Sequence, residues 1–442
     1  MTPVSQVPSR EACTAAARRT WAQVRAAAPE HVSADVDLTQ VTRVVAVVAS
    51  SRGGSSLLHQ ILSDQPDVLS LSGEHTALYK LNGLDRGPDG SDALARDVAF
   101  NREEFSRDFT SLLSSGPARP PVSDTDRACY AAVVTRRIAL QWPLEEIEYA
   151  TVRDAVEHAV RSSSHRDDPA TLFAAVLHRL RVAHPRIDPS FYDLPPALRG
   201  EPRTAELRPP HDGYAIEEPP FVVPQLRTAA DSGALRRLPV VIKSSVDAYR
   251  LPLLRRLLPH AEIRVIHLVR NPAASVNGLY DGWRDRGFFS YDVSDRHTLS
   301  IDGYSELGAA ARRWWNFDIP PGWEKLVDQP LEQVCAAQWA GAHRAALDEL
   351  GPGTADAVLR VPFERITDPA TREGTLRSVF AFAGIPQPRQ PVRLPVVMAT
   401  ARPGPARWRQ RAGLVLPAVD HPVVREVADE LGYRKGEEDT WV

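Results

Sequence analysis

Five consecutive residues near the start of the chain have the types and spacing to bind a phosphate or sulfate group. They lie within residues 43–62, RVVAVVASSRGGSSLLHQIL, which is typical of a buried parallel strand, a tight turn and the start of a helix. The two glycines let the backbone approach a ligand closely, and the first helix amides point outward from the positive end of the dipole. The arginine adds a cation and the serines add hydroxyl donors. The residues of this predicted anion loop are Arg52, Gly53, Gly54, Ser55 and Ser56.

The anion loop matches neither of two common nucleotide-binding loops. A Walker A loop needs a glycine, four residues, a second glycine, and then Lys and Ser/Thr. This loop has one glycine pair and no lysine, and it also lacks the G-x-G-x-x-G spacing of a dinucleotide site. Chemistry on a Mg²⁺–nucleotide is therefore not the first expectation. An ordinary strand-to-helix turn with serine caps is the simpler alternative.

A second anion motif lies at His267–Trp283, which reads HLVRNPAASVNGLYDGW. Arg270 follows a buried strand, and Pro272 opens the next helix. Ligands of open α/β sheets bind at the carboxyl ends of the strands, so we expect Arg52 and Arg270 at equivalent places on one sheet edge. Two such sites suit a ligand with two separated anionic groups. The alternative for Arg270 is a surface arginine that caps a loop.

Alternating strands and helices are expected to hold both motifs. Besides the strand at Val44–Val48, strands are predicted at Leu238–Lys243, Glu262–Val269 and Ala357–Val361. Helices are predicted at Asp247–Leu258, Pro272–Trp283, Leu307–Trp315, Leu331–Leu350, Pro369–Ala383 and Pro422–Leu431. This order predicts the α/β class, with a central parallel sheet that helices cover on both faces.

Two parts of the chain lack this alternation. Residues 1–40 are predicted to form an N-terminal helical extension with one helix, Arg10–Ala28, ahead of a main domain at 41–442. Within that domain, residues 83–235 are interpreted as a helical insertion or cap. Its patterns are helical at Ala93–Leu113, Arg127–Gln141, Leu144–Ser163 and Thr171–Ala183, and proline-rich at Pro185–Pro224.

Composition excludes several classes of protein. The net charge of −3 over 442 residues argues against a nucleic-acid binder. The sequence has no apolar run long enough to span a membrane and no N-terminal signal pattern, so we expect a soluble cytoplasmic protein without a membrane partner. Cys13, Cys129 and Cys335 are far apart, which suggests neither a disulfide framework nor a zinc site. Lysine occurs at only four positions, so a lysine inside a motif stands out.

Together, the two anion motifs resemble those of the sulfotransferases that use 3′-phosphoadenosine-5′-phosphosulfate. The anion loop is similar to that family's 5′-phosphosulfate loop, commonly written Arg-Ser-Gly-Thr-Thr. The second motif resembles the 3′-phosphate motif, an arginine after a buried strand followed by Asn/Asp-Pro and a helix. The family's serine eight residues past this arginine is replaced by Gly278. The resemblance implies that Ser275 or the amide of Asn277 donates to the 3′-phosphate instead.

Further segments extend the resemblance over most of residues 41–435. The segment Ser63–His75 looks like one in tyrosylprotein-type sulfotransferases, where the matching residue of Glu74 is the general base. The strand in VVIKSS resembles the one that delivers a catalytic lysine, here Lys243. RVPFERITDP resembles a late strand–helix unit, and ARPGPARWRQR resembles the basic loop that closes over the nucleotide. In that loop the candidates for nucleotide contact are Arg402, Arg407 and Trp408.

The resemblance implies a P-loop-like core and in-line transfer of a sulfuryl group. The acceptor hydroxyl, or less often amine, must lose a proton, so a carboxylate or imidazole must reach it. Glu74 and His75 offer one of each, with Glu74 the first choice. Lys243 and Arg52 are expected to stabilise charge on the leaving bisphosphate nucleotide. No metal is required, and no cluster has metal-ligand spacing.

The acceptor is expected to be a small molecule such as a metabolite, a natural-product hydroxyl or a sugar. The insertion at 83–235 is expected to bind it, because binding elements tend to be grafted onto a rigid sheet. Two alternatives are a kinase or other phosphoryl transferase and a non-catalytic nucleotide-binding scaffold of the same fold. The absence of a Walker lysine and of an evident Mg²⁺ carboxylate pair disfavours the first, and the pair Glu74 and Lys243 disfavours the second. The sequence does not define an oligomeric state.

Overall fold

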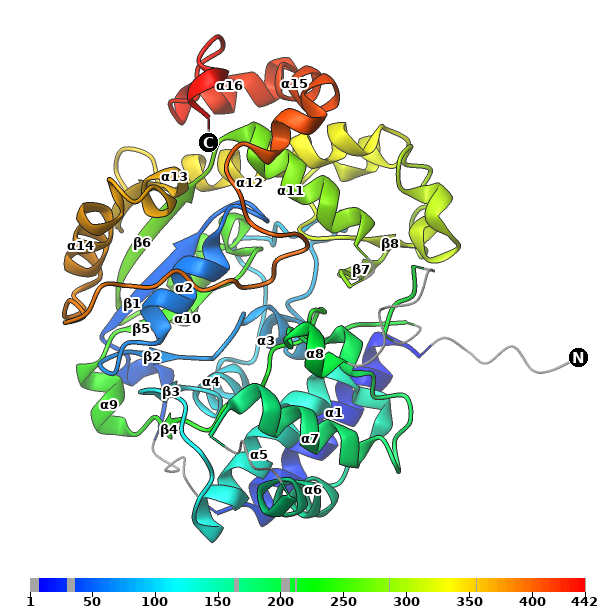
Figure 1. Cartoon of the computed structure of the whole chain (residues 1–442), viewed down its shortest axis with the longest axis vertical. Helices are drawn as coiled ribbons and strands as arrows, with labels where there is room; N and C mark the ends of the chain where they lie inside the picture. The colour runs from blue at the N-terminus through cyan, green and yellow to red at the C-terminus, as the bar shows by residue number, and fades with distance from the viewer. Residues whose placement is uncertain are drawn as a thin grey trace, which may run out of the picture.

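The computed structural model describes residues 8–29, 36–162, 167–199, 207–210, 213–285, 287–354 and 356–441. A seven-stranded sheet of order β4-β3-β2-β5-β1-β6-β9 forms its centre (Figure 1). The strands are β1 Arg43–Val48, β2 Leu69–Ser70, β3 Ser114–Ser115, β4 Thr228–Ala229, β5 Val240–Lys243, β6 Glu262–Val269 and β9 Ala357–Pro362. The five strands from β2 to β9 in this order pair in parallel, whereas β3 and β4 form an antiparallel edge. The predicted α/β class with a central parallel sheet is confirmed.

Helices cover both faces of the sheet, which explains the continuous apolar sequence of its central strand. On β1, Val45 and Val47 belong to the apolar cluster of α2 (Ser55–Ser63) and α14 (Arg372–Ala383). The alternate residues Val44, Ala46 and Val48 face the other cluster. That cluster includes residues of α3 (Thr76–Leu81), α10 (Leu251–Leu257) and α12 (Leu331–Glu349).

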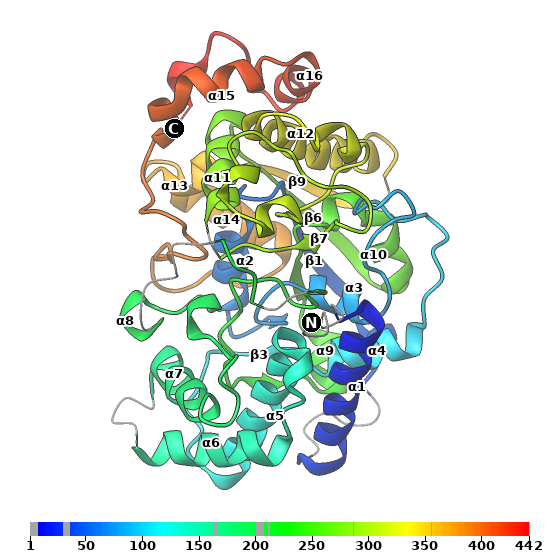
Figure 2. The same ribbon diagram turned by 90° about the vertical axis from the view of Figure 1, so that its right-hand side faces the viewer.

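Part of the insertion forms a helical layer beside the sheet, visible in the lower part of Figure 2, and strands β3 and β4 also lie within the insertion. Its helices are α4 Arg102–Thr110, α5 Asp124–Gln141, α6 Tyr149–Ser162, α7 Pro169–Leu180, α8 Pro196–Arg199 and α9 Ser232–Arg237. The N-terminal helix α1 (Arg10–Ala27) packs on α5, where the indole of Trp21 donates to the Arg136 carbonyl at 3.0 Å. Parts of the predicted extension and of Pro185–Pro224, and the predicted helix end at Ser163, lie outside the described residues.

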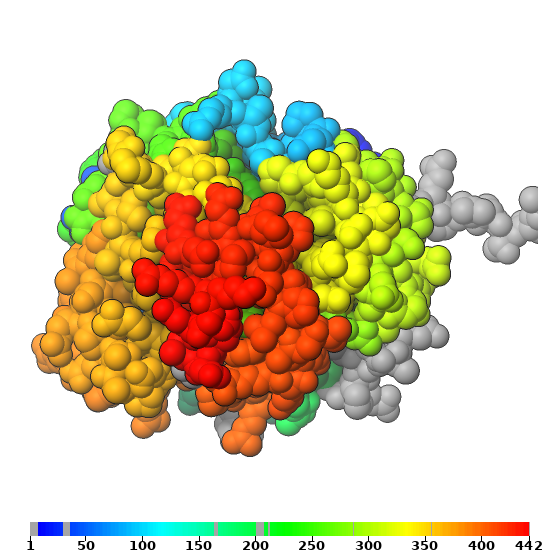
Figure 3. Space-filling view, turned by 90° about the horizontal axis from the view of Figure 1, so that it is seen from above, coloured from blue at the N-terminus to red at the C-terminus, as the bar shows by residue number. Residues whose placement is uncertain are grey.

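The C-terminal part of the chain covers α11 (Pro272–Arg284) and α12. Two helices do so, α15 (Ala412–Val419) and α16 (Pro422–Glu430). Figure 3 shows them, in orange to red, at the centre of the upper face. The sequence predicts α16 but gives only a basic loop ahead of it, so α15 was missed. No helix in the described ranges is both long and apolar enough to cross a membrane.

Two predicted helices differ most from the structure. The helix predicted at Leu307–Trp315 is wrong, because Trp314 and Trp315 form strand β8, which pairs with β7 (Tyr291–Asp292) in a small second sheet. Both tryptophans are buried there, which suits large aromatic residues in a strand. The helix predicted from Ala93 begins only at Arg102, since the Asn101 side chain caps it by accepting from the Glu104 amide at 3.1 Å.

Candidate active site

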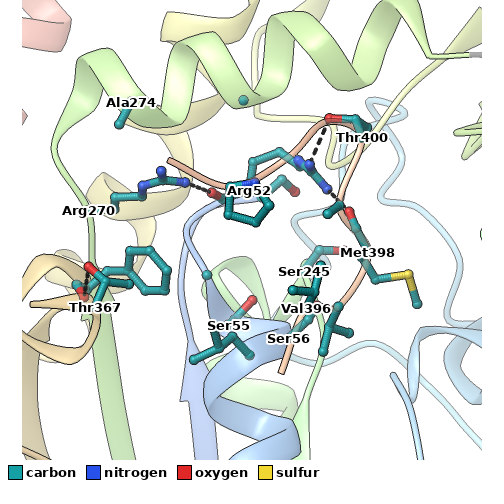
Figure 4. Close-up of a pocket in the computed structure, with 18 of the residues that line it drawn as sticks. Arg52, Ser55, Ser56, Ser245, Arg270, Ala274, Thr367, Val396, Met398 and Thr400 are labelled. Atoms are coloured by element: carbon teal, nitrogen blue, oxygen red, sulfur yellow. Dashed lines mark hydrogen bonds between the residues drawn. The ribbon is translucent and has the colours of Figure 1, made fainter. Parts of the chain in front are cut away.

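A cavity of about 880 Å³ opens at the carboxyl ends of β1, β5 and β6. The structure places both Arg52 and Arg270 on its wall, together with Glu74 and Lys243. Most of residues 394–408, a segment that we call the strap, closes one side. Figure 1 shows the strap, in orange, crossing in front of α2, and Figure 4 shows part of the cavity wall. The two anion motifs therefore share one cavity.

Glycines shape the anion loop. Gly54 has a left-handed φ of 94° as the N-cap of α2, and a Cβ there would lie 2.2 Å from the Phe363 ring. A Cβ at Gly53 would lie 2.8 Å from the Ser50 carbonyl oxygen, which accepts from the Gly53 amide at 3.0 Å. Because Gly54 brings no side-chain cap, the first amides of α2 and the hydroxyls of Ser55 and Ser56 are available to an anion.

Two arginines meet at this loop. Arg270 Nη1 donates to the Arg52 carbonyl at 3.0 Å, while the Arg52 guanidinium donates to the Met398 carbonyl at 2.7 Å and to Thr400 Oγ1 at 3.2 Å (Figure 4). Burial lowers the pKa of both guanidiniums, that of Arg52 to about 10 with a further contribution from Arg270. Both remain cations at neutral pH. Within the described residues, the buried Nε of Arg270 has no hydrogen-bond partner.

The second anion motif departs from the family pattern at Gly278, and the structure explains why a glycine fits there. A Cβ at this position would lie 3.3 Å from the Cβ of Arg52, so glycine leaves room for the arginine. Ser275 is fully buried and does not line the cavity. Asn277 does line it, and its Oδ1 accepts from Arg411 at 2.8 Å. Of the two predicted substitutes for the missing serine, Asn277 is therefore the better placed.

Glu74 and Lys243, 169 residues apart in the sequence, form an ion pair at the cavity. Lys243 Nζ also donates to Ser56 Oγ at 3.2 Å, and the second carboxylate oxygen of Glu74 accepts from the Ser245 amide at 3.0 Å. Burial raises the pKa of Glu74, but Lys243 and the Ser245 amide outweigh burial and hold it below its ordinary value. Glu74 is therefore ionised at neutral pH, beside an ammonium group and the start of α2.

His75, the second candidate base, points elsewhere. Its side chain is fully buried, and its Nε2 lies 3.0 Å from Asp247 Oδ1 and 3.1 Å from the Tyr79 hydroxyl. It does not line the cavity, so the structure leaves Glu74 as the better-placed base. Among the described residues, no group of three or more His, Cys, Asp or Glu side chains could hold a metal ion.

The strap brings only some of its predicted residues to the cavity. Trp408 is buried and lines the wall, and Arg407 also lines it while its guanidinium contacts Asp281 at 2.8 Å. Arg402 is exposed and lies outside the lining. The contacts of Arg52 with Met398 and Thr400 were not predicted. A signal was present in the apolar run LPVVM at 394–398, directly before the basic loop.

Three further side chains of the cavity wall were also missed, namely Glu218, Phe288 and Phe317. They come from three separate irregular segments. No periodic pattern or motif marks these segments in the sequence, so only the folded chain brings them together.

Comparisons with known proteins find solved structures that are similar to this chain. The sulfotransferase domain of the Synechococcus PCC 7002 olefin synthase matches with 14% identity and a TM-score of 0.30. The match covers 78% of this chain and 74% of that domain's chain. Sulfotransferase STF1 from Mycobacterium tuberculosis H37Rv has 12% identity and a TM-score of 0.32, covering 94% of this chain and 81% of that one. No protein-family profile matches the sequence, and no curated protein does. These likenesses are too distant to decide an activity.

Proposed function

We propose that the protein is a sulfotransferase that moves the sulfuryl group of 3′-phosphoadenosine-5′-phosphosulfate to a hydroxyl of a small molecule. The observation that supports this most is the meeting of Glu74, Lys243 and Ser56 at an anion loop whose cavity also contains Arg270. One cavity thus offers two cationic anion sites and an ionised carboxylate. The loop has no Walker lysine, which a P-loop kinase needs.

The arrangement suits in-line transfer, which depends on positioning and charge stabilisation. Glu74 accepts the proton of the acceptor hydroxyl as the acceptor oxygen bonds to sulfur. The bond between sulfur and the bridging oxygen of the 5′-phosphate breaks, and its electron pair stays on that oxygen. Lys243 and the amides of the anion loop stabilise the resulting charge.

The donor's two anionic ends have separate places in this proposal. The anion loop holds the 5′-phosphosulfate, and Arg270 holds the 3′-phosphate. The buried Nε of Arg270, which lacks a partner among the described residues, is a donor that a phosphate oxygen would satisfy. Trp408 is assigned to the nucleoside side. The cytoplasmic location stays a prediction.

A thermal-shift titration of the whole chain tests the proposal, with adenosine 3′,5′-bisphosphate as the ligand and AMP and ATP–Mg²⁺ as comparisons. At 100 times its dissociation constant, a ligand adds about 2.7 kcal/mol to the free energy of unfolding. We expect a clear shift with the bisphosphate and a much smaller one with AMP at equal concentration. A shift with ATP–Mg²⁺ alone would instead indicate a phosphoryl transferase, and no shift with any nucleotide would refute donor binding.

A further inference from the structure

The wall of the cavity beyond the anion loop is aromatic. Phe288 and Phe317 lie with ring centroids 5.0 Å apart, and the Arg52 guanidinium lies 5.3 Å from the Phe288 centroid. This aromatic ledge, Phe288 with Phe317, therefore starts at the anion loop and leads away from it. A Cβ at Gly282 would lie 2.4 Å from the Phe317 ring, so a glycine on α11 makes room for the ledge.

Apolar side chains also close the other sides of this space. Val222 lines the cavity and lies against Gly73, the residue before Glu74, where an added Cβ would be 2.8 Å from its Cγ2. The strap adds Val396 and Met398, which Figure 4 shows near Ser56 and Ser245. Val396 lines the cavity and is 72% exposed. A flat apolar molecule between ledge and strap would cover it.

Two adjacent carboxylates interrupt this apolar surface, Glu217 and Glu218, and Glu217 is paired with Arg137. Glu218 lines the cavity, and its Oε2 accepts from Ser290 Oγ at 3.0 Å. The same serine oxygen accepts from the Phe317 amide at 2.9 Å, so Glu218 is fixed relative to the ledge. The buried ammonium of Lys80 lies 2.9 Å from Glu218 Oε1 and balances its charge. A charge-balanced carboxylate suits a neutral hydrogen-bond donor better than a cation.

We propose, on the basis of the proposed function, that the acceptor is a neutral, flat aromatic alcohol with a second hydroxyl group. Its ring system packs against the Phe288–Phe317 ledge, whose two rings are inclined by 38°, and its reacting hydroxyl reaches Glu74. The second hydroxyl donates to Glu218. The ledge offers too few polar groups for a sugar, and Lys80 removes the net charge that would favour an amine.

A matched series of acceptors tests this proposal in a sulfuryl-transfer assay with the full chain. The series is 2,6-dihydroxynaphthalene, 6-methoxy-2-naphthol, which lacks the second donor, glucose and tyramine. A hydrogen bond to a charged group is worth about 1.5–3 kcal/mol, so the dihydroxy compound should have a kcat/KM about 10- to 100-fold above that of the methoxy compound. Glucose and tyramine should be poorer still.

Two variants assign the preference to residues. Glu218→Gln should bring the kcat/KM values of the dihydroxy and methoxy compounds close together, because an amide can donate a hydrogen bond to the methoxy oxygen. Phe288→Leu should raise the KM of both naphthols about tenfold and leave their ratio unchanged, which keeps the ledge testable if Glu218→Gln folds poorly. Phe382→Leu, a half-buried phenylalanine on α14 outside the cavity, is the matched control.

The outcomes separate this proposal from the proposed function. If the bisphosphate stabilises the protein but glucose or tyramine is the better acceptor, or no naphthol reacts, the acceptor proposal is overturned and donor binding stands. An unchanged dihydroxy-over-methoxy ratio in Glu218→Gln overturns the role of Glu218. If the bisphosphate does not stabilise the protein, the proposed function itself is refuted.

Discussion

The donor half of the cavity is built largely from backbone, whereas the acceptor half is built from side chains. In the donor half, consecutive residues at one sheet edge present amides at the start of α2, and glycines at 53 and 54 leave no room for side chains. In the acceptor half, Glu218, Phe288 and Phe317 come from separate irregular segments. Backbone positions are fixed by the sheet, while side-chain identities can vary on the same scaffold. A change in the donor half should therefore affect every acceptor equally.

The largest expected effect is that of Lys243→Ala. Removing a group that stabilises leaving-group charge typically costs about 10²–10³ in rate. In the transfer assay we expect this loss in kcat for both naphthols alike. In the thermal-shift assay the bisphosphate should still stabilise the variant nearly as much as the unmodified protein. Lys325→Ala, at an exposed lysine away from the cavity, should behave like the unmodified protein. A loss confined to one acceptor would place Lys243 in the acceptor half.

Arg270→Gln should have a smaller effect, and on binding instead of chemistry. Charge-assisted hydrogen bonds are worth about 1.5–3 kcal/mol, so the affinity for adenosine 3′,5′-bisphosphate should fall about 10- to 100-fold in calorimetry. AMP lacks the 3′-phosphate, so its weaker affinity should stay nearly constant. Arg377→Gln, at an exposed arginine on α14 outside the cavity, is the control. Equal losses for both nucleotides would contradict the assignment of Arg270 to the 3′-phosphate.

The same contrast explains what could be predicted from the sequence. The strand Glu262–Val269 has the predicted bounds, and the anion loop, Glu74, Lys243 and Arg270 were all singled out and share one cavity. These features lie in short local patterns, a buried strand followed by a turn and a helix. The acceptor wall has no such pattern, because its residues meet only through the tertiary fold. The wrong helix at Leu307–Trp315 lies just before Phe317 of the acceptor half, and there pairing with β7 overrides local preference.

Asp318 connects the two halves. It follows Phe317 of the aromatic ledge, and its Oδ1 accepts from Ser51 Oγ at 2.5 Å, next to the anion loop. Its Oδ2 accepts from the Tyr249 hydroxyl at 2.7 Å. Burial, with a smaller contribution from the nearby carboxylate of Asp92, raises the pKa of Asp318 to about 7. The two hydrogen bonds act in the opposite direction. The side chain is fully buried, so its ionisation is coupled to folding.

The smallest expected effect is on the pH dependence of stability in Asp318→Asn. The folded protein holds the Asp318 proton up to about pH 7, whereas the unfolded chain releases it near its ordinary pKa of 3.8. The folded state therefore binds more protons between these values, and this group's contribution to stability falls as the pH rises through that window. Asparagine mimics the protonated acid, so urea unfolding at pH 5 and pH 8 should show a smaller decline in the variant than in the unmodified protein.

Titrating groups that do not interact with Asp318, such as the buried His267 and His343, are common to both proteins and cancel in the difference. Asp67→Asn, at an exposed carboxylate, should leave the decline unchanged. Parallel profiles for Asp318→Asn and the unmodified protein would show that Asp318 does not retain its proton in the folded state. The naphthol assays of Asp318→Asn then show which half of the cavity the substitution disturbs. Displacement of Ser51 should lower kcat for both naphthols equally. Displacement of Phe317 should change the KM values of the naphthols and leave bisphosphate binding intact.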